Sequence, residues 1–179
     1  MGRYVALLRA VNVGGTGTLP MSALKSICRD AGFKGIETYI ASGNVVFDSQ
    51  DGAAQVRSTL MSGLRAYSGK SIGVFVRTAA EMRAVLAGNP FARAPPGYTY
   101  AFFLADKPPG DAIAACSGRL DEQIRLGRRE IYVYYPSGMG KSRLRIPAAR
   151  RGTARNINTI AKLAAMSSSK PREELRSSR

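Results

Sequence analysis

Histidine is absent from the 179 residues of this chain. Its absence removes the commonest general base, the commonest nitrogen ligand of metals, and every nucleophile that depends on a histidine base. Any chemistry would therefore depend on Asp, Glu, Lys, Arg or Tyr side chains. The sequence thus disfavours a hydrolase or a metalloenzyme and gives no reason to expect a cofactor. The sequence leaves open whether the chain is an enzyme, and it favours the answer that it is not.

Cysteine is scarce, and long apolar runs are missing. Cys28 and Cys116 have neither the pairing of a disulfide framework nor the spacing of a zinc site. Cys28 shares a helical apolar pattern with Leu24, Ile27 and Ala31, which predicts a core position. No segment approaches the roughly 18 apolar residues that span a bilayer. We therefore expect a cytoplasmic protein that does not contact membranes.

Acidic residues are few, so the chain is strongly basic. Asp and Glu number 12 against 27 Lys and Arg, which gives a net charge of +15. Lys141 to Lys162 contains seven basic residues and no acidic one. Such a field attracts polyanions without regard to their sequence. Two interpretations stay open: a solvated surface that keeps the protein in solution, or a contact for an anionic partner, either nucleic acid or a phosphorylated small molecule.

Apolar periodicity predicts six elements in the first half. Their order is strand, helix, strand, strand, helix, strand, at residues 3–11, 20–31, 36–41, 45–48, 56–64 and 72–76. This order predicts a ferredoxin-like βαββαβ subdomain over residues 1–78. The first strand is apolar on both pleat faces, which indicates a central strand covered on both sides, and we expect the second half to supply one of the covers.

The second half repeats part of this plan. After a short helix at 80–86, the pattern predicts a strand, a helix, a hairpin of two strands and a final helix, at 98–105, 111–116, 122–126, 131–135 and 157–164. We therefore expect residues 79–166 to form a second, degenerate βαββα subdomain packed on the first, so that the fold class is α+β. The Ser-rich, basic residues 167–179 are expected to be a flexible tail.

The predicted topology brings two polar segments to one end of the first sheet. One is the Gly-rich loop after the first strand, and the other is the Ser42-Gly43-Asn44 turn of the hairpin. Glycines allow close backbone approach, and the helix start at Pro20 favours anions. The candidate anion-binding residues here are Arg9, Asn12, Gly14, Gly15, Ser42 and Asn44. In the alternative interpretation, these glycines and Asn44 serve only two tight turns.

A second group of candidates lies in the basic segment. Gly138 to Ser142 resembles part of a phosphate-binding P-loop, but that motif needs a glycine where Tyr135 stands, so a nucleotide-hydrolysing P-loop is excluded. A looser anion-binding turn with Lys141 stays open. Arg155 and Asn156, at the start of the final helix, can hold a phosphate or a carboxylate. The alternative is that Thr153 simply caps this helix.

Four stretches in this order resemble a known bacterial family. They are Tyr4–Gly15, Leu19–Met21, Tyr39–Phe47 and Thr153–Thr159. Together they resemble the domain-of-unknown-function family numbered 1697, over residues 3 to about 166. The family usually has a glycine where this chain has Ala10, and often an aromatic residue at Ile157. The resemblance implies an α+β fold of two subdomains and no established activity.

The sequence therefore favours a binding protein for an anionic partner, with the basic segment as its contact. The alternative is a small-molecule enzyme or sensor, with an anion pocket between the loop after the first strand and the Ser42-Gly43-Asn44 turn. An RNA-recognition motif is disfavoured, because its third strand presents aromatic side chains to bases and Ser42–Phe47 offers one at most.

Overall fold

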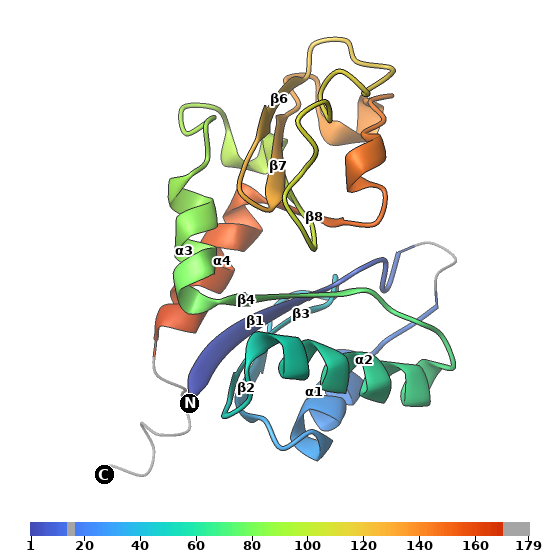
Figure 1. Cartoon of the computed structure of the whole chain (residues 1–179), viewed down its shortest axis with the longest axis vertical. Coiled ribbons are helices and arrows are strands. Elements are labelled where there is room, and N and C mark those ends of the chain that lie inside the picture. Colours follow the sequence, from blue (N-terminus) through green and yellow to red (C-terminus); the bar gives the residue numbers. More distant parts are fainter. Residues whose placement is uncertain (14–16, 170–179) are drawn as a thin grey trace. The chain divides into compact units, whose positions relative to one another are not determined.

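The protein has an α+β fold, as predicted. The structure, a computed structural model, describes residues 1–13 and 17–169. These residues form two four-stranded antiparallel sheets and four α-helices (Figure 1). The chain divides into two compact units, one made of Met1–Arg83 and Lys162–Arg179 and the other of Ala84–Ala161. The first unit therefore takes in residues 79–83 and 162–166, which the sequence analysis assigned to the second subdomain.

The first unit contains all six elements predicted for it. They are β1 (Gly2–Leu8), α1 (Met21–Asp30), β2 (Lys34–Thr38), β3 (Asn44–Ser49), α2 (Ala53–Ser68) and β4 (Val74–Thr78). The strand order is β2-β3-β1-β4, and every neighbouring pair is antiparallel. Because β3 is antiparallel to β1, the end of β1 lies beside the start of β3. The chain therefore leaves β1 at the same end of the sheet as the β2–β3 turn.

Both faces of β1 are buried, as its sequence predicts. Tyr4, Ala6 and Leu8 join a core with the apolar faces of α1 and α2, which cover one side of the sheet (Figure 1). Val5 and Leu7 alternate with them, point to the opposite face and are fully buried. Cys28, on α1, belongs to the first core, which confirms its predicted position.

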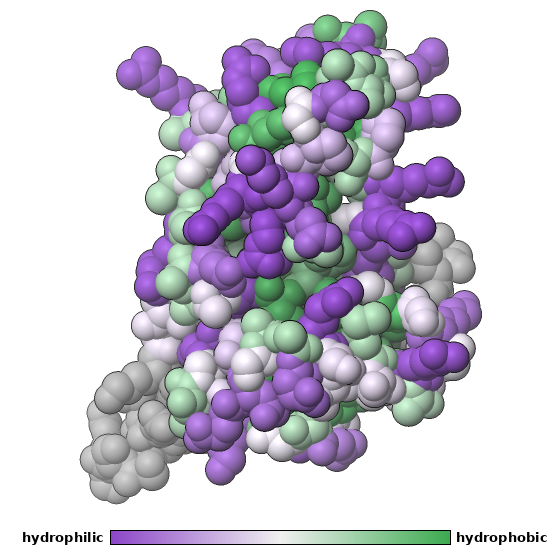
Figure 2. Space-filling view, viewed as in Figure 1, coloured by the Kyte–Doolittle hydropathy of each residue, from purple (hydrophilic) through white to green (hydrophobic). Residues whose placement is uncertain are grey.

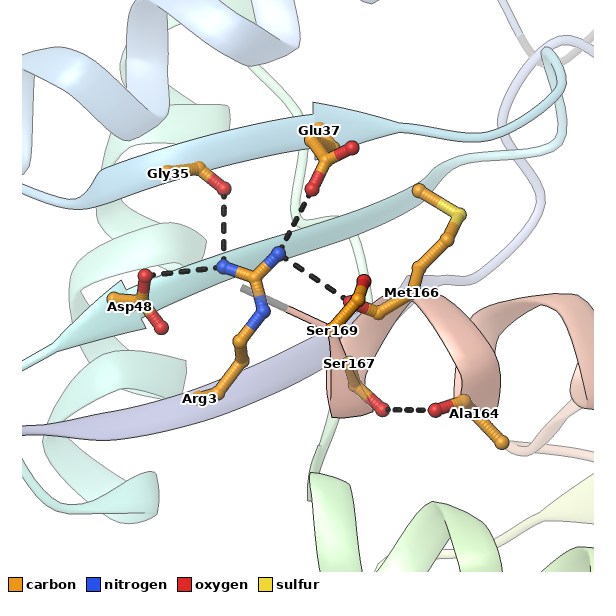
Figure 3. A network of polar contacts seen from close by, with 8 residues as sticks. All are labelled: Arg3, Gly35, Glu37, Asp48, Ala164, Met166, Ser167 and Ser169. Atoms are coloured by element: carbon orange, nitrogen blue, oxygen red, sulfur yellow. Dashed lines mark hydrogen bonds and ion pairs between the residues drawn. The ribbon is translucent and has the colours of Figure 1, made fainter. Parts of the chain in front are cut away.

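Arg3 connects four segments of the first unit (Figure 3). Its guanidinium pairs with Glu37 of β2 at 2.8 Å and with Asp48 of β3 at 3.0 Å. It also donates to the backbone carbonyls of Gly35 and Met166, at 3.3 and 3.4 Å. Met166 lies near the end of α4 (Ile157–Ser168), so this side chain attaches the C-terminal helix to the N-terminal strand.

The second unit has a different order from the one predicted. After α3 (Ala79–Ala87), its strands are β5 (Thr99–Phe103), β6 (Gln123–Leu126), β7 (Glu130–Tyr134) and β8 (Thr153–Asn156), and α4 follows. The sheet order is β6-β7-β5-β8. The helix predicted at 111–116 is wrong: Ala115 N–H donates to the Asp111 carbonyl at 3.0 Å, but these residues form turns. So short a segment does not offset the unfavourable nucleation of a helix.

The sequence analysis missed β8, and Thr153 is not a helix cap. Thr153 pairs with Phe103 of β5, and the Asn156 side chain accepts the Thr159 N–H at 2.9 Å, which makes Asn156 the cap of α4. The predicted tail also begins two residues too early, because Ser167 and Ser168 belong to α4. Residues 170–179 lie outside the described residues. Among the residues that are described, no helix has the length and apolarity to cross a bilayer.

Candidate functional site

The loop after β1 and the β2–β3 turn are in direct contact, as the topology predicts. Leu8 N–H donates to the Gly43 carbonyl at 2.8 Å. Gly43 has a φ of +82°, and a Cβ atom at this position would lie 2.5 Å from Val11 Cγ2 and 2.8 Å from Leu8 Cβ. Glycine is therefore required here both for its backbone conformation and for the close approach of the two segments.

Asn12 fastens this loop to the turn. Its amide nitrogen donates to the Leu19 carbonyl at 2.8 Å and to the Ala41 carbonyl at 2.7 Å, and its amide oxygen accepts the Leu19 N–H at 2.7 Å. Both amide hydrogens are thus used within the chain. The side chain predicted to bind an anion instead holds together the two ends of the loop and the neighbouring turn.

Ser42 and Asn44 shape the turn in a similar way. Asn44 is fully buried, and its amide nitrogen donates to the Tyr39 carbonyl at 2.9 Å and to Ser42 Oγ at 3.0 Å. These contacts support the structural interpretation of the turn. Arg9 is exposed and its backbone N–H donates to the Gly73 carbonyl at 2.8 Å. Gly14 and Gly15 lie outside the described residues.

The backbone at this end of the sheet is strained. Ala10, Asn12 and Ile40 have φ values of 53°, 54° and 49°, in the left-handed region that side chains other than glycine rarely adopt. The value at Ala10 is one that glycine adopts without steric cost. Strained residues of this kind gather at functional sites more often than elsewhere.

A cavity of about 660 Å³ opens beside the strained loop. Its walls include Asn12, Val13, Thr18 and Ala41, together with Met21 at the start of α1. Pro20 occupies the cap position and makes no side-chain hydrogen bond to this helix start, and the first turn contains no acidic residue. Of the predicted anion-binding residues that the structure describes at this end of the sheet, only Asn12 lines the cavity.

Residues 142–146 of the second unit are extended and follow the 3₁₀ turn Met139–Lys141, and exposure alternates along residues 141–146. Lys141, Arg143 and Arg145 are exposed, whereas Leu144 and Ile146 are half-buried against the core of the second unit. Arg145 also forms a backbone bridge with Ser117, at 2.8 and 3.1 Å. Within the described part of the chain, none of the three basic side chains has a carboxylate at ion-pair distance. We call Lys141, Arg143 and Arg145 the basic strip.

Arg155 and Asn156 are occupied inside the second unit. Arg155 is only 7% exposed, and it donates to Thr153 Oγ1 at 2.7 Å and to the Ala154 carbonyl at 2.9 Å. Burial lowers its pKa to about 10, so the guanidinium is still charged at neutral pH. Asn156 caps α4. Of the three candidates predicted in this half, Lys141 alone presents its side chain to solvent.

Glu122 forms a polar cluster beside the basic strip that the sequence analysis did not identify. It is 3% exposed and accepts the Leu120 N–H at 2.6 Å and the hydroxyl of Ser142. The hydrogen bond from Ser142 lowers the pKa of this carboxyl. The described residues contain no group of acidic or cysteine side chains that could hold a metal ion. Overall, the face drawn in Figure 2 is largely hydrophilic, with small apolar areas between the polar side chains.

Comparisons with known proteins identify the family and the fold of the chain, and they indicate no activity. The family model described as "Protein of unknown function (DUF1697)" matches residues 1–132. No curated protein matches the chain. The solved structure of the conserved bacterial protein SP0830 from Streptococcus pneumoniae superposes with a TM-score of 0.75 at 23% identity, over 92% of this chain and 98% of that chain. At this level of identity the similarity shows a shared fold.

Proposed function

The chain belongs to the DUF1697 family of proteins of unknown function, as its motifs indicated, and from this premise we propose that it binds an anionic partner through the basic strip. The observation that carries the proposal is that Lys141, Arg143 and Arg145 are all exposed and alternate with half-buried residues. Arg143 and Arg145 lie on extended chain, where alternate residues are about 6.6 Å apart, and Lys141 ends the 3₁₀ turn directly before them. The phosphates of a nucleic-acid backbone offer closely spaced negative charges to such a cluster.

The charge of the second unit supports the same proposal. Residues 84–161 contain 12 Lys and Arg against 5 Asp and Glu, an excess of 7 positive charges. Long-range attraction of this sign raises the association rate with polyanions. A nucleic acid is therefore the partner we favour, bound through its backbone without regard to sequence.

A salt titration tests this proposal. A fluorescently labelled oligonucleotide should bind at about 50 mM salt, and the logarithm of its affinity should fall linearly with the logarithm of salt concentration. Replacing Lys141, Arg143 and Arg145 with Gln should weaken binding and reduce that slope by about 3, since each phosphate contact contributes roughly 0.9. Replacing the exposed Arg29, Arg65 and Lys70 with Gln removes the same charge from the first unit and should change little. Absence of binding at low salt, or equal losses in both triple variants, would contradict the proposal.

A second candidate function is a small-molecule enzyme or sensor at the strained end of the first sheet. The cavity of about 660 Å³ beside the start of α1 favours it. In a thermal-shift screen, a phosphorylated metabolite at 100 times its dissociation constant should add roughly 2.7 kcal/mol to the free energy of unfolding. Asn12 lines the cavity, so Asn12→Ala should remove this stabilisation by the ligand. Asn44 does not line the cavity, so Asn44→Ala should lower stability but leave the stabilisation by the ligand unchanged. If no phosphorylated compound stabilises the protein, this candidate is eliminated.

We also interpret the first unit as ferredoxin-like. The element order β1-α1-β2-β3-α2-β4, the strand order β2-β3-β1-β4 and the placement of both helices on one face support this finer description.

A further inference from the structure

We propose that the second unit also holds a binding site for a small apolar carboxylate, in a cavity of about 320 Å³ between β5 and residues 139–150. This site is separate from the basic strip, which faces outward. The apolar part of its wall comes from Phe102, Met139, Leu144, Ile146 and Ala149. Three polar side chains complete it, namely Tyr135, Ser142 and Arg150.

The cavity exists because irregular segments cover this face of the sheet. Tyr100 and Phe102 of β5 point to a core that is closed by turns and extended chain, with short 3₁₀ turns at Met139–Lys141 and Pro147–Ala149. The cavity is partly open to solvent, and its volume equals that of about ten water molecules, at roughly 30 Å³ each. Its size lies at the lower end of the usual range for a small-molecule site.

Tyr135 provides a polar group that points to a ligand. The residue is 4% exposed, and none of the side-chain hydrogen bonds among the described residues involves its hydroxyl. Among all the described residues, Arg3 Nε alone is a fully enclosed side-chain polar atom without a hydrogen-bond partner, so the Tyr135 hydroxyl keeps some exposed surface. Burial raises the pKa of Tyr135, and the nearby Glu122 charge raises it further, so the side chain stays a neutral O–H donor. A hydroxyl donor without a protein partner in a cavity favours a ligand that carries an acceptor.

The charges around the cavity favour an anionic acceptor. Arg150 lines the cavity, and the positive side chains of the basic strip belong to the same covering segment. The carboxylate whose charge acts on Tyr135 is Glu122, which is not part of the wall and accepts hydrogen bonds from Ser142 and Leu120. A carboxylate ligand can therefore pair with the Arg150 guanidinium and accept the Tyr135 hydroxyl, while its apolar body contacts Phe102 and Ile146.

Isothermal titration and thermal shift with matched compounds test this inference. Octanoate and benzoate are the probes, octanamide and benzamide have the same bodies without the charge, and acetate has the charge without a body. We expect at least one of the two acids to bind and raise the melting temperature, its amide to bind at least tenfold more weakly, and acetate to have no effect. Whichever acid binds more tightly identifies the body, an alkyl chain or an aromatic ring, that the cavity accepts.

Four variants make the test specific to the cavity. Tyr135→Phe removes only the hydroxyl and should weaken carboxylate binding at least fivefold, Arg150→Gln should weaken it more, and Ala149→Leu should abolish it by filling the space. Arg151→Gln is the matched control, because Arg151 is exposed and does not line the cavity. If Arg150→Gln or Ala149→Leu does not fold, the carboxylate affinity of Tyr135→Phe decides whether the inference holds.

The inference is overturned if neither acid binds, if the amides bind equally well, or if Tyr135→Phe binds like the original chain. The carboxylate site and the proposed binding of an anionic partner by the basic strip are independent, so either can be disproved while the other stands. The triple variant of the basic strip should lose oligonucleotide binding and keep carboxylate binding, whereas Tyr135→Phe should do the opposite.

Discussion

Ala10 has a backbone conformation that suits glycine. Its φ of 53° places the Cβ atom close to the following carbonyl oxygen, which costs roughly 1–2 kcal/mol. Ala10→Gly should remove this strain, although the added freedom of the unfolded chain takes back about 0.4–1 kcal/mol. We therefore expect a net gain of about 0.5 kcal/mol or more in the free energy of unfolding, measured with urea.

The matched control is Ala114→Gly, at an exposed alanine whose φ is not positive. It should lower stability, because only the loss in chain entropy remains. If Ala10→Gly destabilises the protein as much as Ala114→Gly does, the strain at Ala10 is not significant.

Individual side chains also show why a site is harder to predict than a fold. The sequence correctly placed the loop after β1 next to the β2–β3 turn, because strand order alone determines that proximity. It could not show that the amide of Asn12 is already bonded to Leu19 and Ala41, or that Asn44 is fully buried. Those outcomes depend on loop conformation, which has no periodic signal in the sequence.

At the scale of the elements, Arg3 joins β1 to β2, β3 and α4. Its side chain is 11% exposed, so Arg3→Gln would leave Glu37 and Asp48 poorly solvated and without a counter-charge. We expect the free energy of unfolding to fall by about 3 kcal/mol, as for other largely buried pairs that lose one partner. Urea denaturation would measure this change.

Glu37→Gln is the companion variant. Glu37 is 27% exposed, and Arg3 would keep Asp48 as a partner, so the loss should be clearly smaller. Equal losses in the two variants would mean that the guanidinium does not act as the common centre of the network.

Helices and strands with a clear apolar period were predicted well, and short ones were not. The six elements of the first unit follow periods of 3.6 or 2 residues, and each was identified. β8 has only four residues, Thr-Ala-Arg-Asn, which are too few to show alternation, and its pairing with β5 is a tertiary contact. The apolar residues at 111–116 have a helical composition, but one turn between Pro109 and Gly118 has no neighbour to propagate it.

At the scale of the whole molecule, the two cysteines report on different units. Cys28 is in the first unit and fully buried, and burial raises its pKa to about 12. Cys116 is in the second unit and half-buried, and burial also raises its pKa. In the native protein, iodoacetamide should modify Cys116 slowly and Cys28 far more slowly still, since Cys28 becomes accessible only when the first unit opens.

Pulsed labelling along a urea gradient, with the modified peptides identified by mass spectrometry, measures the two events separately. Coincident transitions would show that the units unfold together, and separate transitions would show that they do not. Modification of Cys28 at the rate of Cys116 in the absence of urea would contradict the buried position of Cys28.

The first unit is assembled from both ends of the chain, because Met166 of α4 accepts a hydrogen bond from Arg3 of β1. This arrangement has a consequence for biosynthesis. A ribosome adds about 5–20 residues per second, so the roughly 80 residues after Arg83 take about 4–16 s to appear. During that interval β1 lacks the helix that its Arg3 will bind. The second unit is continuous in sequence and needs nothing made later, so the half of the protein that is synthesised first is the half that is completed last.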